Sequence, residues 1–362
     1  MKVTHIIERL DTGGAQSLLA QLLPAISARG AVDVTVMVYQ SCGSAIEESL
    51  RQTPGVRFVN LDLKQTRTLS PVFRMVSEVR EADVVHAHLF PALYHVALAS
   101  WIAGTPAVYT EHNVTNRRRR HKALRLPERM IYGMYAGVTS ISNAGVESLR
   151  SWLGEGGENV SLIPNGIDVS RFAIERPHPS QWPVIFGRSG RAIVMVSRFS
   201  AAKDQATLIR AVPHIEDKEA FVVLVGDGET RGEVERLASE LGVSDRVVFT
   251  GNRSDVPRLL AAAEIGVLST HWEGMSMSVI EMMASGLPIV ATDVAGMREM
   301  LDGVGRLVPE GDERALAGVL NELLTGGCRE DAGRIAVSRQ RAGRYDIAAV
   351  AEAYVRLYKE LV

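Results

Sequence analysis

The chain has 362 residues, which is more than one ordinary hydrophobic core accommodates and fits two domains of usual size. Hydrophobic residues make up 46% and charged residues 23% of it, the balance of a soluble globular protein, and the formal charge of −2 argues against nucleic acid as a partner. The two cysteines, Cys42 and Cys328, lack metal-ligand spacing, which indicates a reducing compartment.

No segment predicts a leader or a membrane span. Glu8 and Arg9 interrupt the first apolar run before the core of a signal peptide could form. The nearest candidate for a span, residues 89–104, contains Pro91 and His95 and is shorter than the roughly 20 apolar residues that a spanning helix needs. We therefore expect a cytoplasmic protein.

Short apolar runs alternate with amphipathic stretches along most of the chain. This alternation predicts strand–helix–strand units and parallel sheets with helices on both faces. The expected strands are 3–7, 34–38, 56–61, 84–86, 107–110, 137–141, 192–197, 221–225, 247–250, 265–268, 289–292 and 305–308. The expected helices are 15–29, 71–80, 93–103, 127–135, 204–212, 230–241, 255–262, 278–284, 313–324 and one in the last twenty residues.

The alternation pauses after residue 169, in a stretch that holds Pro177, Pro179 and Pro183. We interpret residues 171–190 as a linker between domain 1–170 and domain 191–344. Residues 345–362 are predicted to form a helix that packs back toward the first domain. The fold class is α/β, with two Rossmann-like, doubly wound domains that face a cleft and present the carboxyl ends of their strands to it.

Two loops that follow strands could bind phosphate. Gly13 and Gly14 stand where the first strand turns into a helix, so backbone amides could approach an anion there, although a tight structural turn explains them as well. Arg198 and Lys203 follow the strand 192–197 and precede a helix. An Arg fork and a Lys point charge can hold a diphosphate, and two ordinary surface charges are the alternative.

The segment from Thr270 to Asp293 carries two glutamates, Glu273 and Glu281, separated by seven residues. Glu281 has capping-box spacing from Ser278, near which we expect the helix to begin. Glu273 lies in a loop and has no such structural explanation. Carboxylates so placed can accept hydrogen bonds from the vicinal hydroxyls of a ribose and a sugar.

This segment resembles the signature of glycosyltransferase family 4, retaining enzymes of the GT-B architecture. The resemblance includes the run from Gly286 to Asp293, the segment from Ile163 to Asp168 and the order of the motifs from residue 3 to 361. It implies a retaining transfer of a hexose-type sugar from a nucleotide-diphosphate sugar to a glycan or lipid-linked acceptor, in cell-envelope or exopolysaccharide synthesis.

The resemblance also implies roles for single residues. Arg198 and Lys203 would bind the donor diphosphate, Glu281 the ribose hydroxyls and Glu273 the hydroxyls of the transferred sugar. His112 matches the catalytic histidine of the family, which contacts that sugar. The remaining donor-binding positions would be Gly13, Gly14, Asn252, Arg253, Gly274, Met275, Ser276 and Met277.

Metal and cofactor chemistry is not expected. No Asp-x-Asp pair occurs to hold a divalent cation on the diphosphate, and the two cations can replace one electrostatically. His86 and His88 suggest a zinc site, but we expect them to be poor joint ligands because they would point to opposite faces of their strand. His88 is instead a second candidate for the acceptor side.

The basic segment from Arg117 to Arg129 is interleaved with apolar residues and could lie on an anionic membrane surface. A solvated loop is the alternative. The segment belongs to the domain expected to bind the acceptor, so we hypothesise a peripheral enzyme on the inner face of the cell membrane.

Three rival functions remain open. A sugar-nucleotide epimerase or hydrolase on the same architecture would need no acceptor. A non-catalytic relative that only binds nucleotide sugars should have lost the Arg/Lys pair or the glutamates. A glycosidase could use Glu273 and Glu281 as acid and base, although the phosphate-directed cations disfavour it.

Overall fold

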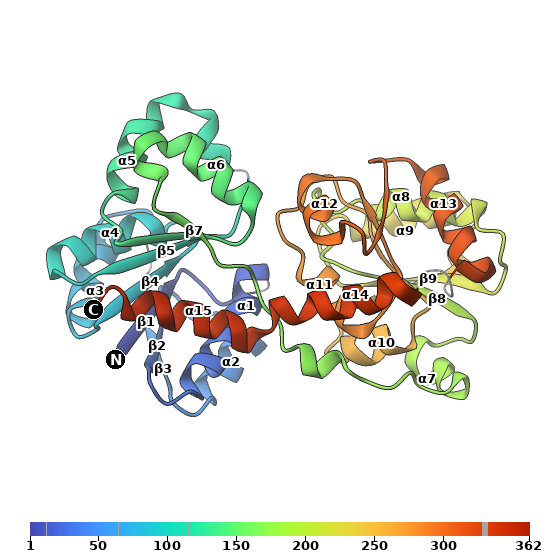
Figure 1. Cartoon of the computed structure of the whole chain (residues 1–362), viewed down its shortest axis with the longest axis horizontal. Helices are drawn as coiled ribbons and strands as arrows, with labels where there is room; N and C mark the ends of the chain where they lie inside the picture. The colour runs from blue at the N-terminus through green and yellow to red at the C-terminus, as the bar shows by residue number, and fades with distance from the viewer. Residues whose placement is uncertain (12, 64, 115, 328–331) are drawn as a thin grey trace. The chain divides into compact units, whose positions relative to one another are not determined.

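The structure is a computed structural model that describes residues 1–11, 13–63, 65–114, 116–327 and 332–362. The chain forms two compact units (Figure 1). Unit 1 consists of Met1–Ile167 together with Asp346–Val362, and unit 2 consists of Asp168–Tyr345. Cys328 lies outside the described residues. No helix of the described residues is long and apolar enough to cross a membrane.

Unit 1 is built on a seven-stranded parallel sheet in the order β3-β2-β1-β4-β5-β6-β7. The strands are β1 (Lys2–Ile7), β2 (Asp33–Val38), β3 (Val56–Asn60), β4 (Val84–His88), β5 (Ala107–Glu111), β6 (Gly137–Ser140) and β7 (Val160–Leu162). The helices are α1 (Gly14–Ser27), α2 (Ala45–Arg51), α3 (Ser70–Arg80), α4 (Ala92–Ala103), α5 (Arg125–Tyr132), α6 (Asn143–Leu153) and α15 (Ile347–Lys359).

Unit 2 is built on a six-stranded parallel sheet in the order β10-β9-β8-β11-β12-β13. The strands are β8 (Arg191–Val196), β9 (Ala220–Val225), β10 (Val247–Gly251), β11 (Ile265–Leu268), β12 (Ile289–Thr292) and β13 (Arg306–Val308). The helices are α7 (Trp182–Phe186), α8 (Gln205–Ala211), α9 (Arg231–Glu240), α10 (Val256–Ala262), α11 (Met277–Ser285), α12 (Ala295–Leu301), α13 (Glu313–Glu322) and α14 (Ala332–Ala342).

Both sheets reverse their strand order once, between β1 and β4 in unit 1 and between β8 and β11 in unit 2. The central strands are buried on both faces and are therefore apolar along their whole length, as β9 shows with AFVVLV. At each reversal the loops from neighbouring strands diverge to opposite faces, which leaves a crevice at the carboxyl ends. The predicted α/β class with two Rossmann-like domains is confirmed.

Several elements differ from the prediction. The strand β7 and the helices α2, α6, α7, α12 and α14 were not expected, and α7 lies within the stretch 171–190 that we interpreted as a linker. The helix α2 has a detectable signal, because Ser44 caps it and accepts a hydrogen bond from the amide of Glu47, which also stands at capping-box spacing. The last helix, α15, packs beside α1 in unit 1.

Candidate functional site

The strand reversal of unit 2 brings two predicted loops together. β8 and β11 are adjacent and parallel, with Ile193 opposite Ile265 in register, so their carboxyl ends meet at the same edge of the sheet. The loop after β8 carries Arg198 and Lys203, and the loop after β11 carries Glu273. Residues that are 70 positions apart in the chain therefore share one edge of the sheet.

Backbone hydrogen bonds join these two loops. Lys203 and Thr270 form an isolated antiparallel bridge. The amide of His271 donates to the carbonyl of Ala202 at 2.9 Å, and the hydroxyl of Thr270 donates to the same carbonyl at 2.7 Å. Since main-chain contacts fix both loops, the side chains that follow are held in register with one another.

Lys203 and Glu273 form an ion pair across the joined loops. Their side chains are only 17% and 16% exposed, so water screens the pair less than it would screen a surface contact. The sequence singled out both residues but did not predict that they pair. In the absence of a ligand, each neutralises the other.

Arg198 lies apart from this pair. Its side chain is 64% exposed and contacts Glu229, in the loop after β9, at 3.2 Å. Such an exposed ion pair contributes little to stability, so breaking it costs little. The structure therefore leaves the guanidinium able to exchange Glu229 for an anionic ligand.

Two glycines let the loop after β9 pack on the loop after β8. Gly226 and Gly228 have φ values of 134° and 154°, a conformation that side-chain-bearing residues rarely adopt. A Cβ at these positions would stand 2.2 Å from the carbonyl oxygen of Ser197 and 2.1 Å from that of Phe199. The role of these two glycines is this close approach of backbone to backbone.

The helix α11 begins earlier than predicted. Its N-cap is Ser276, whose hydroxyl accepts from the amide of Val279 at 3.4 Å. The predicted capping box between Ser278 and Glu281 is therefore wrong, because Glu281 lies one turn beyond the cap. Met275 and Ser276 are buried, while Gly274 and Met277 are partly exposed at the helix N-terminus.

Glu281 projects from α11 into a half-buried position, with no hydrogen-bond partner among the described residues. Burial raises the pKa of its carboxyl to about 7, and the positive charge of Arg171 opposes the shift only in part. Arg171 belongs to η4 (Val169–Phe172), a turn that packs against α11. A carboxyl group with a pKa near 7 and no hydrogen-bond partner among the described residues is a candidate binding group.

Asn252 and Arg253 follow β10 at the outer part of the same edge. Asn252 is exposed, whereas Arg253 makes a bidentate contact with Asp255, with both N–O distances at 2.7 Å. This contact raises the pKa of Arg253 and lowers that of Asp255. The Arg253 guanidinium is thus engaged, which leaves the backbone of this loop as the accessible part.

The first loop of unit 1 begins α1 at Gly14, with Gly13 as its N-cap. A Cβ added to Gly14 would meet nothing within 4 Å, so protein packing does not require glycine there. A Cβ at Gly13 would meet only the end of the flexible Gln16 side chain. This open helix N-terminus can receive an anion.

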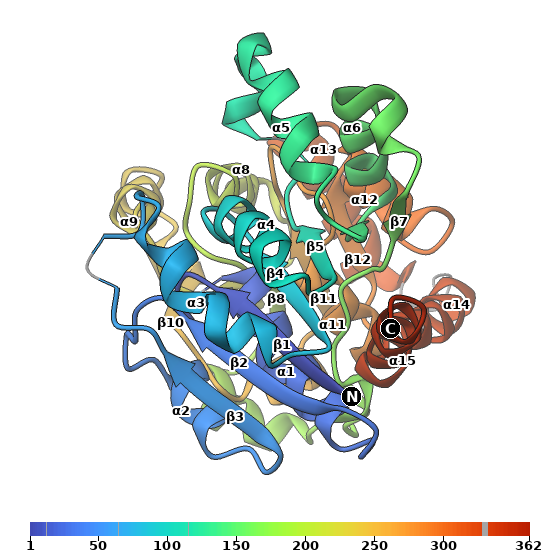
Figure 2. The ribbon, with the colours of Figure 1, turned by 90° about the vertical axis from the view of Figure 1, so that its left-hand side faces the viewer.

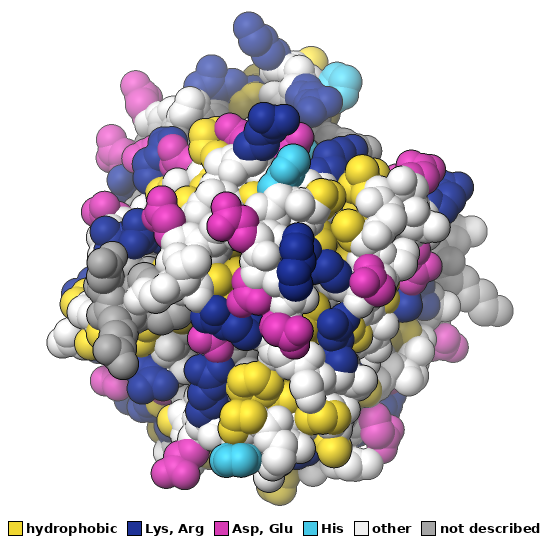
Figure 3. Space-filling view, turned by 90° about the vertical axis from the view of Figure 1, so that its right-hand side faces the viewer, with side chains coloured by type: hydrophobic (Ala, Val, Ile, Leu, Met, Phe, Trp, Pro, Cys, Tyr) yellow, Lys and Arg dark blue, Asp and Glu magenta, His cyan; other side chains and the backbone are white. Residues whose placement is uncertain are grey.

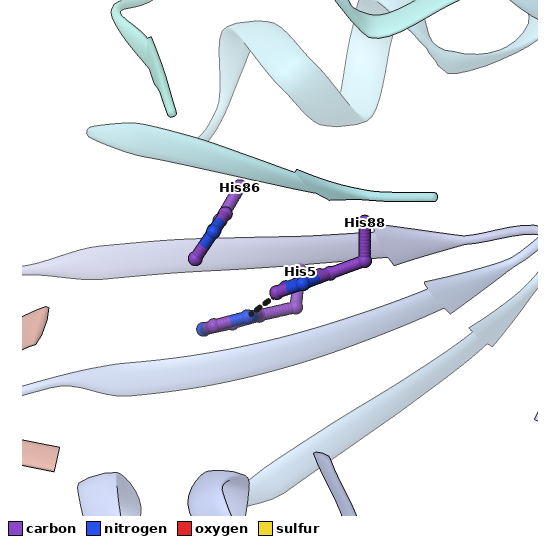
Figure 4. A group of neighbouring side chains, drawn as sticks. All are labelled: His5, His86 and His88. Atoms are coloured by element: carbon purple, nitrogen blue, oxygen red, sulfur yellow. Dashed lines mark hydrogen bonds between the residues drawn. The ribbon is translucent and has the colours of Figure 1, made fainter. Parts of the chain in front are cut away.

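Histidines gather beside the strand reversal of unit 1. His5 comes from β1, and His86 and His88 come from β4; all three are fully buried. The rings turn toward one another (Figure 4), and those of His86 and His88 have centroids 4.1 Å apart. The expectation that His86 and His88 point to opposite faces is wrong, because residues two apart on a strand share a face. Sequence reasoning did not single out His5.

His112 lies just after β5 and joins this group through His88, with 3.2 Å between its Nε2 and the Nδ1 of His88. Its own Nδ1 is buried and has no hydrogen-bond partner in the part of the chain that the structure describes. Burial lowers the pKa of His112 to about 4, so the ring is neutral near pH 7. The predicted catalytic histidine therefore has its Nε2 in a hydrogen bond with His88 and its Nδ1 without a partner among the described residues.

The basic segment of unit 1 is partly structural. Arg119 pairs with the buried Glu111 at 2.6 Å, and Arg118 pairs with the buried Glu128 at 3.2 Å. Arg118 also stacks over the rings of Phe90 and Tyr94. The exposed cations of the segment are Arg120, Lys122, Arg125 and Arg129.

Comparisons with known proteins cover both units. A family model described as Glycosyltransferase Family 4 matches residues 12–171, and one described as Glycosyl transferases group 1 matches residues 190–326. The lipopolysaccharide core biosynthesis glycosyltransferase LpsE of Rhizobium meliloti is 27% identical over 99% of this chain and 98% of its own length.

Two further proteins are similar to this chain, one in sequence over part of its length and one in structure over nearly all of it. A galactosyltransferase of Escherichia coli that uses UDP-Gal and α-D-GlcNAc-diphosphoundecaprenol is 24% identical over 65% of this chain and 63% of its own length. The structure of HepE from Anabaena in complex with UDP and glucose matches with a TM-score of 0.85, 23% identity, and coverage of 99% of this chain and 100% of that one. At that identity, the structural match supports the fold alone.

Gly296→Ala should disturb the loop that carries Glu273. A Cβ at Gly296 in α12 would lie 2.3 Å from the carbonyl oxygen of Gly274 and 2.4 Å from that of Glu273. Relieving the clash must move α12 or the loop, at about 1–3 kcal/mol of unfolding free energy. Gly318→Ala is the matched control, because a Cβ there meets nothing within 4 Å and the change should stabilise α13 by about 0.5–1 kcal/mol. Equal melting temperatures for the two variants would contradict the close approach.

Glu281→Gln should raise the melting temperature most at alkaline pH. The folded pKa of about 7 exceeds the ordinary value of 4.5, so wild-type stability falls as pH rises between these values and the cost is complete above pH 7. That cost is at most about 3 kcal/mol. The gain should be several degrees at pH 8 and shrink toward pH 5, as thermal unfolding across this range would measure. The exposed Glu240→Gln should show no such trend, and a pH-independent difference for Glu281→Gln would argue against the raised pKa.

Proposed function

The chain belongs to the group 1, family 4 glycosyltransferases, and on that premise we propose that it transfers a hexose-type sugar from a nucleotide-diphosphate sugar, with retention of anomeric configuration, to a lipid-linked or cell-envelope glycan. The observation that carries the proposal is the group of ligand-facing residues at the strand reversal of unit 2. Cations and carboxylates stand there on loops that main-chain bonds hold together.

The donor is assigned to unit 2. Lys203 exchanges its ion pair with Glu273 for the diphosphate, and Arg198 exchanges Glu229 for it. Glu273, released from Lys203, accepts hydroxyls of the transferred sugar. The carboxylate of Glu281, which has no hydrogen-bond partner among the described residues, accepts the ribose hydroxyls. The base rests on the backbone of Asn252 and Arg253.

Departure of the nucleotide leaves negative charge on the diphosphate. Arg198 and Lys203 supply two positive charges at that position, which is the task that a divalent cation performs in other transferases. We propose that no metal and no further cofactor is needed. The N–H groups of Gly274 to Met277 at the start of α11 add favourable dipoles.

Unit 1 is proposed to hold the acceptor. The relatives LpsE and the galactosyltransferase are named for lipopolysaccharide core and diphosphoundecaprenol substrates, and these names support an acceptor in the envelope. Gly13 and Gly14 at the start of α1 are proposed for the donor phosphate, and the His112 nitrogen without a hydrogen-bond partner among the described residues is proposed for the transferred sugar.

Membrane docking is proposed for one end of unit 1, where α5 and α6 lie together (Figure 2). Leu126 and Met130 on α5 are 68% and 64% exposed, and exposed cations flank them. Apolar side chains ringed by cations suit an anionic lipid surface. By contrast, the face seen in Figure 3 intersperses basic and acidic side chains without gathering one sign.

Arg198→Ala and Lys203→Ala should each lower turnover by about 10²–10³ while the protein stays folded. A panel of nucleotide sugars is screened for thermal stabilisation of the wild type, and transfer is then measured with the donor that binds. Lys218→Ala, an exposed cation away from these loops, is the control. Near-wild-type turnover in both site variants would refute the diphosphate assignment. Consumption of donor without any acceptor product would favour a hydrolase or epimerase, and the anomeric signal of the product would test retention.

Leu126→Glu/Met130→Glu should abolish flotation with vesicles of phosphatidylcholine and phosphatidylglycerol at low salt. The control converts two exposed apolar residues of unit 2, Val184→Glu/Val337→Glu, which should leave flotation unchanged. Pure phosphatidylcholine vesicles should recruit less wild-type protein, because the cations contribute only at an anionic surface. Absence of wild-type flotation at low salt would end the membrane proposal.

A further inference from the structure

A continuous line of hydrogen bonds runs through the core of unit 1 and ends at His112. His112 Nε2 lies 3.2 Å from His88 Nδ1, and His88 Nε2 lies 3.1 Å from His5 Nδ1. His5 Nε2 lies 3.4 Å from the hydroxyl of Tyr358 on α15. The rings of His88 and His5 thus connect His112, at the carboxyl end of the sheet, with α15 (Ile347–Lys359).

The line continues beyond Tyr358. The Tyr358 hydroxyl lies 2.7 Å from His86 Nδ1, and His86 Nε2 lies 2.7 Å from the hydroxyl of Thr110. Thr110 in turn contacts the hydroxyls of Thr139 at 2.7 Å and Tyr354 at 3.2 Å. The line therefore ends in a buried group of hydroxyls, which can both donate and accept.

All four rings are neutral near pH 7. Burial lowers the pKa of His5 to about 3, and it lowers those of His86 and His88 well below their usual range. A neutral imidazole donates through one nitrogen and accepts through the other. Each ring in the line must then donate where its neighbour accepts, so the tautomer at one end of the line restricts the tautomer at the other end.

Metal binding is a weaker explanation for this arrangement. Ligand nitrogens of His5, His86 and His88 do lie within 4.8 Å of one another. However, all six ring nitrogens of these residues already have a hydrogen-bond partner in a side chain. A metal ion would have to displace several of those bonds in a fully buried space.

Three arrangements of protons satisfy every link of the line, because the hydroxyl of Tyr358 can donate to one of its two rings or accept from both. In the first, all four rings carry the proton on Nε2, and His112 Nδ1 is a lone pair. In the second, all four carry it on Nδ1, and His112 buries an N–H without an acceptor. In the third, His86 alone carries it on Nδ1, and the O–H of Tyr358 has no acceptor in the line. Because orphaned buried donors are rarer than unsatisfied acceptors, the first arrangement is favoured.

We propose that Tyr358, through His5 and His88, holds His112 in the Nε2–H tautomer, so that His112 Nδ1 is a fixed acceptor for a substrate hydroxyl. Tyr358, His5 and His88 are then positioning residues. Only the identity of that hydroxyl, as one from the sugar or the acceptor, rests on the proposed function. The tautomers themselves belong to the ligand-free protein.

The test is nitrogen-15 NMR of the full chain labelled at histidine, with resonances assigned by single substitution. In the wild type, His5, His86, His88 and His112 should all be Nε2–H tautomers. A mixed set among His5, His88 and His112 would overturn the continuous line, and Nδ1–H tautomers at all three would overturn its direction. An Nδ1–H tautomer at His86 alone would overturn the continuation of the line through Tyr358. These spectra need no variant. One equivalent of a transition metal in the purified protein, lost in His86→Ala, would also overturn the proposal.

Tyr358→Phe should leave His5 Nε2 and His86 Nδ1 without a partner and shift His112 from one tautomer to a mixture of both. With an active donor and acceptor, its kcat should fall by about 10- to 100-fold, as for other losses of an orienting contact. Tyr354→Phe keeps the ring that contacts His86 and removes a hydroxyl of the same helix that bonds Thr110 rather than a histidine, so it should change neither. An unchanged His112 spectrum in Tyr358→Phe would overturn the role of Tyr358. If the wild type transfers no sugar, the function fails while the spectra still decide the tautomer.

Discussion

The main-chain bridge between Lys203 and Thr270 is the contact on which the arrangement of unit 2 at its strand reversal depends. It joins the loops after β8 and β11, and the ion pair between Lys203 and Glu273 spans the same two loops. The loop with Gly226 and Gly228 packs on the loop after β8, and α12 packs through Gly296 on the loop after β11. Both approaches are possible only because those positions have no side chain. The carbonyl oxygens of Ser197, Phe199, Glu273 and Gly274 are thereby in close contact with the backbone of neighbouring elements.

The ion pair between Lys203 and Glu273 also explains how both charged side chains remain at the site when no ligand is bound. The two partly buried opposite charges neutralise each other where water screens them only in part. An incoming diphosphate and sugar offer replacement partners of the correct sign to both residues. Arg198 is kept ready in a different way, since it remains solvated and only weakly held. The two cations therefore differ in how much protein rearrangement their engagement requires.

Much of this was predictable from the sequence, because the strands of unit 2 are short, apolar and separated by regular intervals. The positions of Arg198, Lys203, Glu273 and Glu281 at strand and helix ends followed from the same pattern. Pair partners did not follow, since whether Lys203 meets Glu273 or the diphosphate depends on loop geometry that periodicity does not encode. The N-cap of α11 was placed two residues late, at Ser278 instead of Ser276, because two serines compete for one cap.

Unit 1 shows where such reasoning fails for a different reason. His5 stands in an apolar strand with no local signal, and its importance arises only when β1 and β4 lie side by side. The error over His86 and His88 came from assigning alternate residues to opposite faces. Glu111 and Glu128 likewise show that part of a conspicuous basic run serves the interior, because each neutralises one arginine of it.

The helix α15 gives unit 1 a discontinuous sequence. Tyr354 and Tyr358 fill its interior, yet the whole of unit 2 separates them from the rest of their core. On the ribosome, Asp168–Tyr345 emerges complete before this helix does, although most of unit 1 was made first. Unit 1 can therefore complete its core only after Ile347–Lys359 has been synthesised, which leaves its histidine-lined interior incomplete while unit 2 is made.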